Sequence, residues 1–148
     1  RGEVTINSKN PEDLPKIIPN YLSTQSDQNI AIDSIKVARK IANASPLKQH
    51  ILDEFVPGGS LVSDEDLLEA AKNNSQSIYH PVGTCKMGND KNSVVDDQLK
   101  VYGVKGLRVV DASIMPELVS GNTNAPTMMI AEKAAAMILS DNKVSLTK

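Results

Sequence analysis

The clearest periodicity in the chain is helical and covers residues 26–44. Charged and amide side chains lie opposite a broad apolar arc that comprises Ile30, Ala31, Ile35, Val37, Ala38, Ile41 and Ala42. This spacing predicts an amphipathic helix, with Ile32 alone on the polar side. Pro46 ends the pattern, and residues 47–55 are expected to form a turn or a short helix before the Pro-Gly-Gly run at 57–59.

Two further helices are predicted nearer the C-terminus. Ser63 supplies a hydroxyl cap ahead of three carboxylates, which favours a helix that ends near Asn74. Another helix is predicted over residues 127 to about 139, with Pro126 at its first position. Its apolar residues cover nearly the whole circumference, so it should need burial on several sides. Residues 141–148 are expected to form a disordered tail.

Short extended segments are predicted between the helices. Residues 2–8 alternate polar and β-branched side chains, which indicates a strand with one solvated side. Three prolines lie within residues 10–21, which should therefore form an extended connector. Strands are also predicted for residues 78–79, 93–104 and 107–110. The pattern favours an α+β fold with a mostly antiparallel sheet flanked by helices.

Composition narrows the class of protein. A chain of 148 residues with 40% hydrophobic content is long enough for one domain with a core. A formal net charge of −2, without a long basic run, gives no electrostatic reason to expect nucleic acid or an anionic membrane surface as partner. No apolar run approaches the length of a transmembrane helix. The lone Cys85 cannot form an internal disulfide. These features favour a cytoplasmic location, although a targeting segment could precede Arg1.

Candidate chemistry is densest over residues 77–88. This segment holds His80, one of two histidines, and Cys85, the only cysteine. Because Pro81 follows, the backbone of His80 is excluded from the helical region, and an imidazole at a strand end can exchange protons near neutral pH. The alternative is an ordinary turn or core histidine bonded to a backbone carbonyl. His50 is interpreted as a structural or surface histidine.

Two other uses of the segment are disfavoured. A zinc site built on His80 and Cys85 would need two more ligands, and His50 belongs to a different predicted element. The hypothesis that Cys85 is a thiol nucleophile with His80 as its base is equally disfavoured, because a lone cysteine is more often a small buried residue. No metal site is therefore expected.

Polar groups also follow the strand predicted for residues 107–110. Asp111 comes directly after it, a position where ligands of open α/β sheets bind. Alternatively, the Asp111 carboxylate caps the loop through nearby amides. The polar loop at residues 120–124 leads to the last helix, whose first amides, such as that of Thr127, are available to an anionic or carbonyl oxygen.

Four motifs in order resemble the C-terminal portion of the glucose–methanol–choline (GMC) oxidoreductases. They are SIYHPVGTCKMG at 77–88, SVVD at 93–96, VYGVKGLRVVDAS at 101–113 and SGNTNAPTMMIAEKAA at 120–135. The opening RGEVTINS and the PNYL at 19–22 fit the start of the same portion. The resemblance therefore covers essentially the whole chain.

The resemblance implies FAD-dependent oxidation of a primary alcohol, choline-like or other, to an aldehyde. His80 matches the family's active-site histidine, which takes the hydroxyl proton while a hydride passes from the substrate carbon to flavin N5. Asn124 matches a second active-site position. As an amide it cannot act as a base, so it would hydrogen-bond the substrate oxygen.

The resemblance also implies contacts with FAD. Asp111 and Ala112 match the segment that meets the ribityl–pyrophosphate part of the cofactor. Pro126 and Thr127 match the helix start that faces the flavin's pyrimidine carbonyl. Since Pro126 has no N–H, the amide of Thr127 is the expected donor.

The chain lacks the Gly-x-Gly-x-x-Gly fingerprint that seats a dinucleotide. The resemblance therefore implies that the last strand and helix belong with a missing N-terminal FAD-binding domain, and that the chain alone is inactive. The expected partners are that domain, an alcohol, and an electron acceptor, which could be oxygen, a quinone or another carrier. The alternative is a free-standing, non-catalytic α+β binding or interaction domain.

Overall fold

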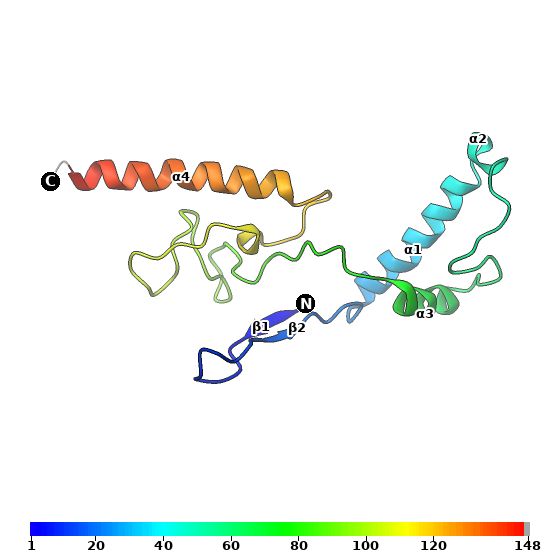
Figure 1. Cartoon of the computed structure of the whole chain (residues 1–148), viewed down its shortest axis with the longest axis horizontal. Helices are drawn as coiled ribbons and strands as arrows, with labels where there is room; N and C mark the ends of the chain where they lie inside the picture. Colours follow the sequence, from blue (N-terminus) through cyan, green and yellow to red (C-terminus); the bar gives the residue numbers. More distant parts are fainter. Residues whose placement is uncertain (147–148) are drawn as a thin grey trace. The chain divides into compact units, whose positions relative to one another are not determined.

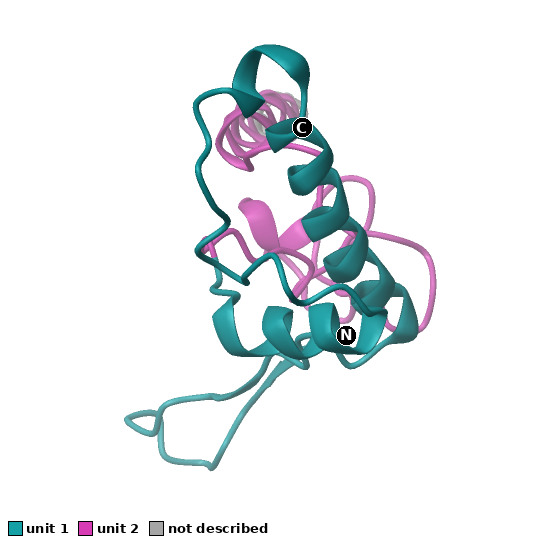
Figure 2. Cartoon of the chain, turned by 90° about the vertical axis from the view of Figure 1, so that its right-hand side faces the viewer, with its two compact units in different colours: residues 1–77 teal, residues 78–148 magenta. Residues whose placement is uncertain are grey.

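The computed structural model describes residues 1–146 of the 148-residue chain, with side chains described up to residue 141. The elements, in order, are β1 (Glu3–Thr5), β2 (Lys16–Ile18), α1 (Gln25–Ala42), α2 (Ser45–Lys48), α3 (Asp64–Asn74), the 3-10 helix η1 (Ala112–Ile114) and α4 (Asn124–Leu146) (Figure 1). The chain divides into two compact units, Arg1–Ser77 and Ile78–Lys148 (Figure 2). None of the described helices is both long and apolar enough to cross a membrane.

The content of helices and strands confirms the α+β prediction, but the predicted sheet is much reduced. In the described residues, the one sheet is the antiparallel pair β1–β2, in which Val4 lies opposite Ile17. The segment at residues 10–21 contains no helix, as predicted, but three of its residues form β2 and pair with β1 instead of serving only as a connector. Pro15 and Pro19 flank this strand rather than interrupt it, so its three residues keep the N–H groups that a ladder needs.

Helices α1 and α3 confirm two of the predicted helices, and each begins at a hydroxyl cap. The side chain of Thr24 accepts the N–H of Asp27, and that of Ser63 accepts the N–H of Asp66. These bonds satisfy amides that have no acceptor within the helix. The cap at Ser63 was predicted, whereas α1 was predicted from its periodicity and begins one residue earlier than expected.

The two helices pack against each other around α3's apolar side. Leu67 is 1% exposed, and Ala70 and Ala71 are buried with it. On α1 the buried residue is Ile32, which the helical wheel had assigned to the polar side, whereas the arc assigned to the core is largely exposed and includes Ile30, Val37 and Ile41. That prediction was wrong because the position of α3, not the width of the apolar arc, decides which flank is covered.

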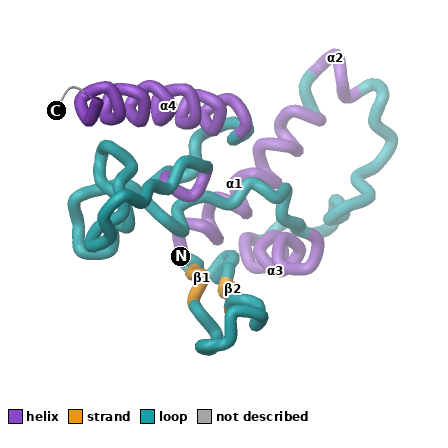
Figure 3. The backbone as a smooth tube through the Cα atoms, turned by 60° about the vertical axis from the view of Figure 1, so that its left-hand side comes forward, coloured by secondary structure: helices purple, strands orange, loops and turns teal. Residues whose placement is uncertain are grey.

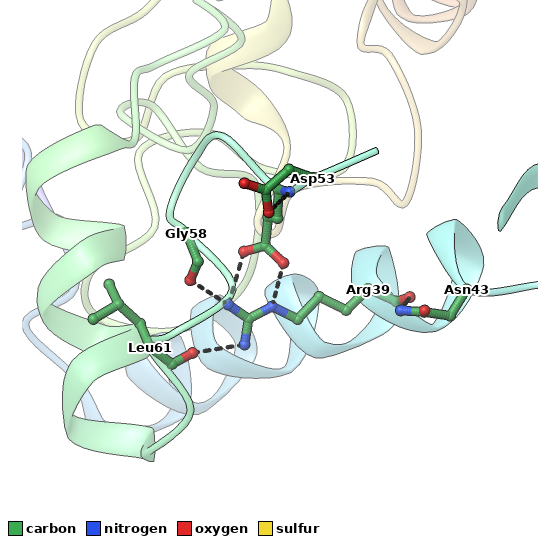
Figure 4. A network of polar contacts seen from close by, with 6 residues as sticks. Arg39, Asn43, Asp53, Gly58 and Leu61 are labelled. Carbon is green, nitrogen blue, oxygen red and sulfur yellow. Dashed lines mark hydrogen bonds and ion pairs between the residues drawn. The ribbon is translucent and has the colours of Figure 1, made fainter. Parts of the chain in front are cut away.

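Arg39 on α1 holds the long segment between α2 and α3 (Figure 4). Its Nε and Nη2 donate to the two carboxylate oxygens of Glu54 at 2.8 and 2.7 Å, the paired geometry that suits a guanidinium. It also donates to the carbonyl oxygens of Leu61 at 2.8 Å and Gly58 at 3.1 Å. The hydrogen bonds from Arg39 lower the pKa of the Glu54 carboxyl. One side chain therefore shapes this segment.

Apart from η1 and α4, the described part of the second unit is mostly loop (Figure 3), and it has a small core. The core comprises Val95, Leu99, Ile114, Met115, Ile130 and Ala134. The strands predicted at 78–79, 93–104 and 107–110 do not form; in their place the described residues make isolated bridges, such as Lys100 with Arg108. Positive φ angles at Tyr79, Leu99 and Gly103 turn the backbone and prevent longer ladders.

Helix α4 is longer at both ends than the sequence predicted. It begins at Asn124, so Pro126 is its third residue rather than its first, and it continues to Leu146 instead of ending near residue 139. Asp141 forms ion pairs with Arg108 at 2.6 Å and Lys100 at 2.9 Å, inside the segment expected to be a tail. Contacts between distant segments do not appear in a local pattern. Residues 147 and 148 lie outside the described residues.

Candidate functional site

His80 lies in an irregular loop rather than at a strand end. Tyr79 before it has a φ of 62°, and Pro81 follows it. The imidazole is half-buried, so it is neither sealed in the core nor fully in solvent. The prediction of a strand before His80 was wrong, because the turn at Tyr79 breaks the extended run.

The loop after His80 is fixed to the η1 segment by backbone hydrogen bonds. The N–H of Cys85 donates to the carbonyl of Ser113 at 3.0 Å, and that of Met87 to the carbonyl of Ile114 at 2.8 Å. Gly83 has a φ of 87°, and a Cβ there would lie 3.3 Å from the Met115 carbonyl oxygen. A side chain at this position would therefore be strained, which favours glycine.

A buried threonine connects His80 to the start of α4. The Oγ1 atom of Thr123 lies 3.2 Å from Nδ1 of His80, and Thr123 is only 7% exposed. The carbonyl oxygen of Thr123 accepts two bonds from Thr127, one from its N–H at 3.0 Å and one from its hydroxyl at 2.6 Å. His80 is thus brought beside the helix end whose first residue is Asn124, which is exposed.

Asp111 caps η1. Its carboxylate accepts the N–H of Ser113 at 2.7 Å and also the Ser113 hydroxyl. This confirms the capping interpretation, while the Asp111 side chain stays exposed. Ala112 is the first residue of η1 and packs against the core. Because η1 also contacts α4, the capped turn helps to fix the helix that carries Asn124.

The amides at the start of α4 differ in availability. The N–H of Thr127 is bonded to Thr123, so it is not free to serve an external oxygen as the sequence had suggested. Pro126 has no N–H. The first-turn amides without an acceptor inside the helix are therefore those of Asn124 and Ala125.

Together these groups can move a proton and bind an oxygen atom. His80 provides a ring that can accept a proton, while Asn124 and the free amides beside it provide donors at the positive end of α4. His50 is an exposed residue of the first unit, in agreement with its interpretation as a surface histidine. Within the described residues, no group of three or more His, Cys, Asp or Glu side chains could hold a metal ion.

Thr123 is the residue of this site that the sequence did not reveal. It lies in a polar loop of similar residues, 43 positions from His80. The available signal was weak: a threonine directly before a helix is a good cap candidate. Its contact with a histidine depends on the tertiary fold.

Comparison with protein families identifies the chain. The model of the GMC oxidoreductase C-terminal domain matches residues 1–131. The chain belongs to the GMC oxidoreductase family. The resemblance in the four motifs is thereby confirmed.

Named relatives agree with this assignment. The chain is 50% identical to an alcohol dehydrogenase [acceptor] of Pseudomonas putida, over 94% of this chain and 25% of that protein. It is 46% identical to an oxygen-dependent choline dehydrogenase of Escherichia coli, over 93% of this chain and 25% of that protein. Among solved structures, an FAD-dependent oxidoreductase from Chaetomium thermophilum matches with a TM-score of 0.89 and 32% identity, over 96% of this chain and 25% of that one. The chain thus spans about a quarter of the length of these GMC relatives.

Proposed function

We propose that this chain is the substrate-side domain of an FAD-dependent enzyme that oxidises a primary alcohol to an aldehyde. The observation that carries the proposal is the half-buried His80, held through Thr123 beside the first turn of α4. A proton acceptor and oxygen-binding groups then lie together in a chain of the GMC family. The relatives named for alcohol and choline oxidation support this substrate class.

In this proposal His80 takes the proton of the alcohol hydroxyl. Removing that proton makes the oxygen more alkoxide-like, which favours the departure of a hydride from the neighbouring carbon. Asn124 has no basic atom, so its amide N–H donates a hydrogen bond to the same oxygen. In this proposal, His80 transfers the proton and Asn124 orients the substrate oxygen.

The residues at the start of α4 fit an FAD carbonyl group. When bound, FAD supplies the hydride acceptor that the protein itself lacks. The amides of Asn124 and Ala125 have no acceptor inside the helix and lie at its positive end, which suits an oxygen that gains negative charge. Pro126 and Thr127 shape this helix start, while Asp111 and Ala112 provide the neighbouring capped turn for the rest of the cofactor.

Exposed apolar side chains indicate where the rest of such an enzyme would pack. On α4, Met128, Met129 and Leu139 are 56, 55 and 62% exposed, although the opposite face is buried through Ile130 and Ala134. Patches of this kind commonly mark interfaces. We infer that an FAD-binding domain covers the exposed face of α4.

The test is a pair of histidine variants in the full-length, FAD-loaded enzyme. His80→Ala should lower turnover of a primary alcohol by about a hundredfold or more, the usual scale for a lost general base, while the flavin absorbance is kept. His50→Ala is the matched control and should be nearly silent, because His50 is an exposed side chain outside the motifs on which the proposal rests. Full turnover in the His80 variant would refute the role assigned to this residue.

A further inference from the structure

We propose that Thr123 is a positioning residue that selects the tautomer of His80. Its hydroxyl oxygen accepts the N–H of Nδ1, so that Nε2 keeps a free lone pair and is the atom that takes the alcohol proton. This inference rests on the proposed function, since the state of Nε2 matters only if His80 is the base.

The burial of Thr123 and the hydrogen bonds around it indicate a specific contact with His80. Thr123 is 7% exposed and is the one buried polar residue among those whose side chains the structure describes. A buried hydroxyl needs a hydrogen-bond partner, and His80 Nδ1 at 3.2 Å supplies it. The backbone of Thr123 is fixed in turn by the two bonds from Thr127 to its carbonyl oxygen.

The direction of the hydrogen bond follows from the proton that the ring must take up. A neutral imidazole has one donor and one acceptor nitrogen. If Thr123 donated to Nδ1, then Nε2 would already carry the ring proton and could not receive another. If Nδ1 donates to Thr123, then Nε2 is free, and the same bond persists and strengthens once the ring is charged. Only this second arrangement serves His80 both before and after proton transfer.

The hydrogen bond between Thr123 and His80 also explains how a loop residue can be held in a catalytic orientation. His80 follows a turn with positive φ at Tyr79 and belongs to no helix or strand. Thr123, in contrast, directly precedes the 23-residue helix α4. The contact with Thr123 therefore holds the imidazole of His80 beside the helix end that carries Asn124. Reactive groups work best when a rigid element and a supporting hydrogen bond fix them.

The experiment compares Thr123→Val with Thr123→Ser in the full-length, FAD-loaded enzyme. Valine keeps the shape but removes the acceptor, so kcat should fall about 10- to 100-fold, the range for one hydrogen bond to a charged group, with a smaller change in KM. Serine keeps the hydroxyl and should restore most of kcat. A purely structural role would not separate the two variants in this way.

A spectroscopic measurement reports the tautomer directly. In enzyme labelled with ¹⁵N-histidine, the His80 signals are assigned by their absence in a His80→Asn variant. We expect the wild-type ring to carry its proton on Nδ1, and Thr123→Val to populate the Nε2–H form. A wild-type ring protonated on Nε2 would overturn the inference, even where the valine variant fails to fold.

The same set of variants separates this inference from the proposed function. If His80→Asn is inactive but Thr123→Val retains wild-type kcat, the positioning role of Thr123 is wrong and the role of His80 stands. If His80→Asn retains full turnover, the proposed function is itself wrong.

Discussion

At His80, the local backbone and a distant hydroxyl act on the same ring. Pro81 and the turn at Tyr79 present the imidazole from a loop, and Thr123 holds its Nδ1 from the start of a helix. The local residues place the half-buried side chain in a loop rather than in a helix or strand. In our proposal, the distant residue decides which ring nitrogen faces the substrate.

Asp141 shows how a single carboxylate stabilises the second unit. Hydrogen bonds from Arg108, and then from Lys100, lower its pKa below the ordinary value. A lowered pKa in the folded state means that the carboxylate stabilises the fold above the unfolded value, about 3.9. This contribution is lost as the pH falls through the lower, folded-state pKa.

We therefore predict a pH-dependent effect for Asp141→Asn. The variant should have a lower melting temperature than wild type at pH 7, and the difference should shrink progressively in acid below about pH 4. The effect should be modest and weaken with salt, because these side chains are partly exposed. Thermal unfolding across pH checks it, with Glu132→Gln, an exposed carboxylate on the same helix, as the control. A constant difference at every pH would contradict the ion-pair explanation.

Among the elements, the α1–α3 pair depends on one fully buried leucine. Leu67→Ala should reduce the free energy of unfolding by about 2–5 kcal/mol, because it removes apolar contacts and leaves a cavity. Leu67→Met conserves volume and should cost less than about 1.5 kcal/mol. Urea unfolding followed by circular dichroism measures both. Equal losses in the two variants would mean that packing at this position is not the cause.

Helices were more predictable than strands for a physical reason. The caps at Thr24 and Ser63 act within four residues, so the sequence contains the whole interaction. The pairing of Lys100 with Arg108 depends instead on turns at Leu99 and Gly103, whose positive φ angles limit it to a single bridge. Residues that favour strands are not sufficient where the backbone turns between them.

For the whole molecule, the proposed function predicts that this chain by itself is not an enzyme. Each of its two units has buried residues, but α1 and α4 leave apolar side chains exposed. The chain also covers only about a quarter of the length of its relatives. After incubation with FAD and gel filtration, the chain alone should elute without flavin absorbance and should not oxidise alcohols. A flavin spectrum that co-elutes with the chain would show that no further domain is needed for binding.

The amino-acid sequence by itself determined the start of α3, the family and the motif that carries His80, because these depend on neighbouring residues and on motif order. Only the tertiary structure decided that Ile32 faces the core of its unit, that Asp141 pairs with Arg108, and that Thr123 meets His80. Each of these joins segments far apart in the chain. Such contacts depend on how the elements pack, and no local pattern of residues encodes them.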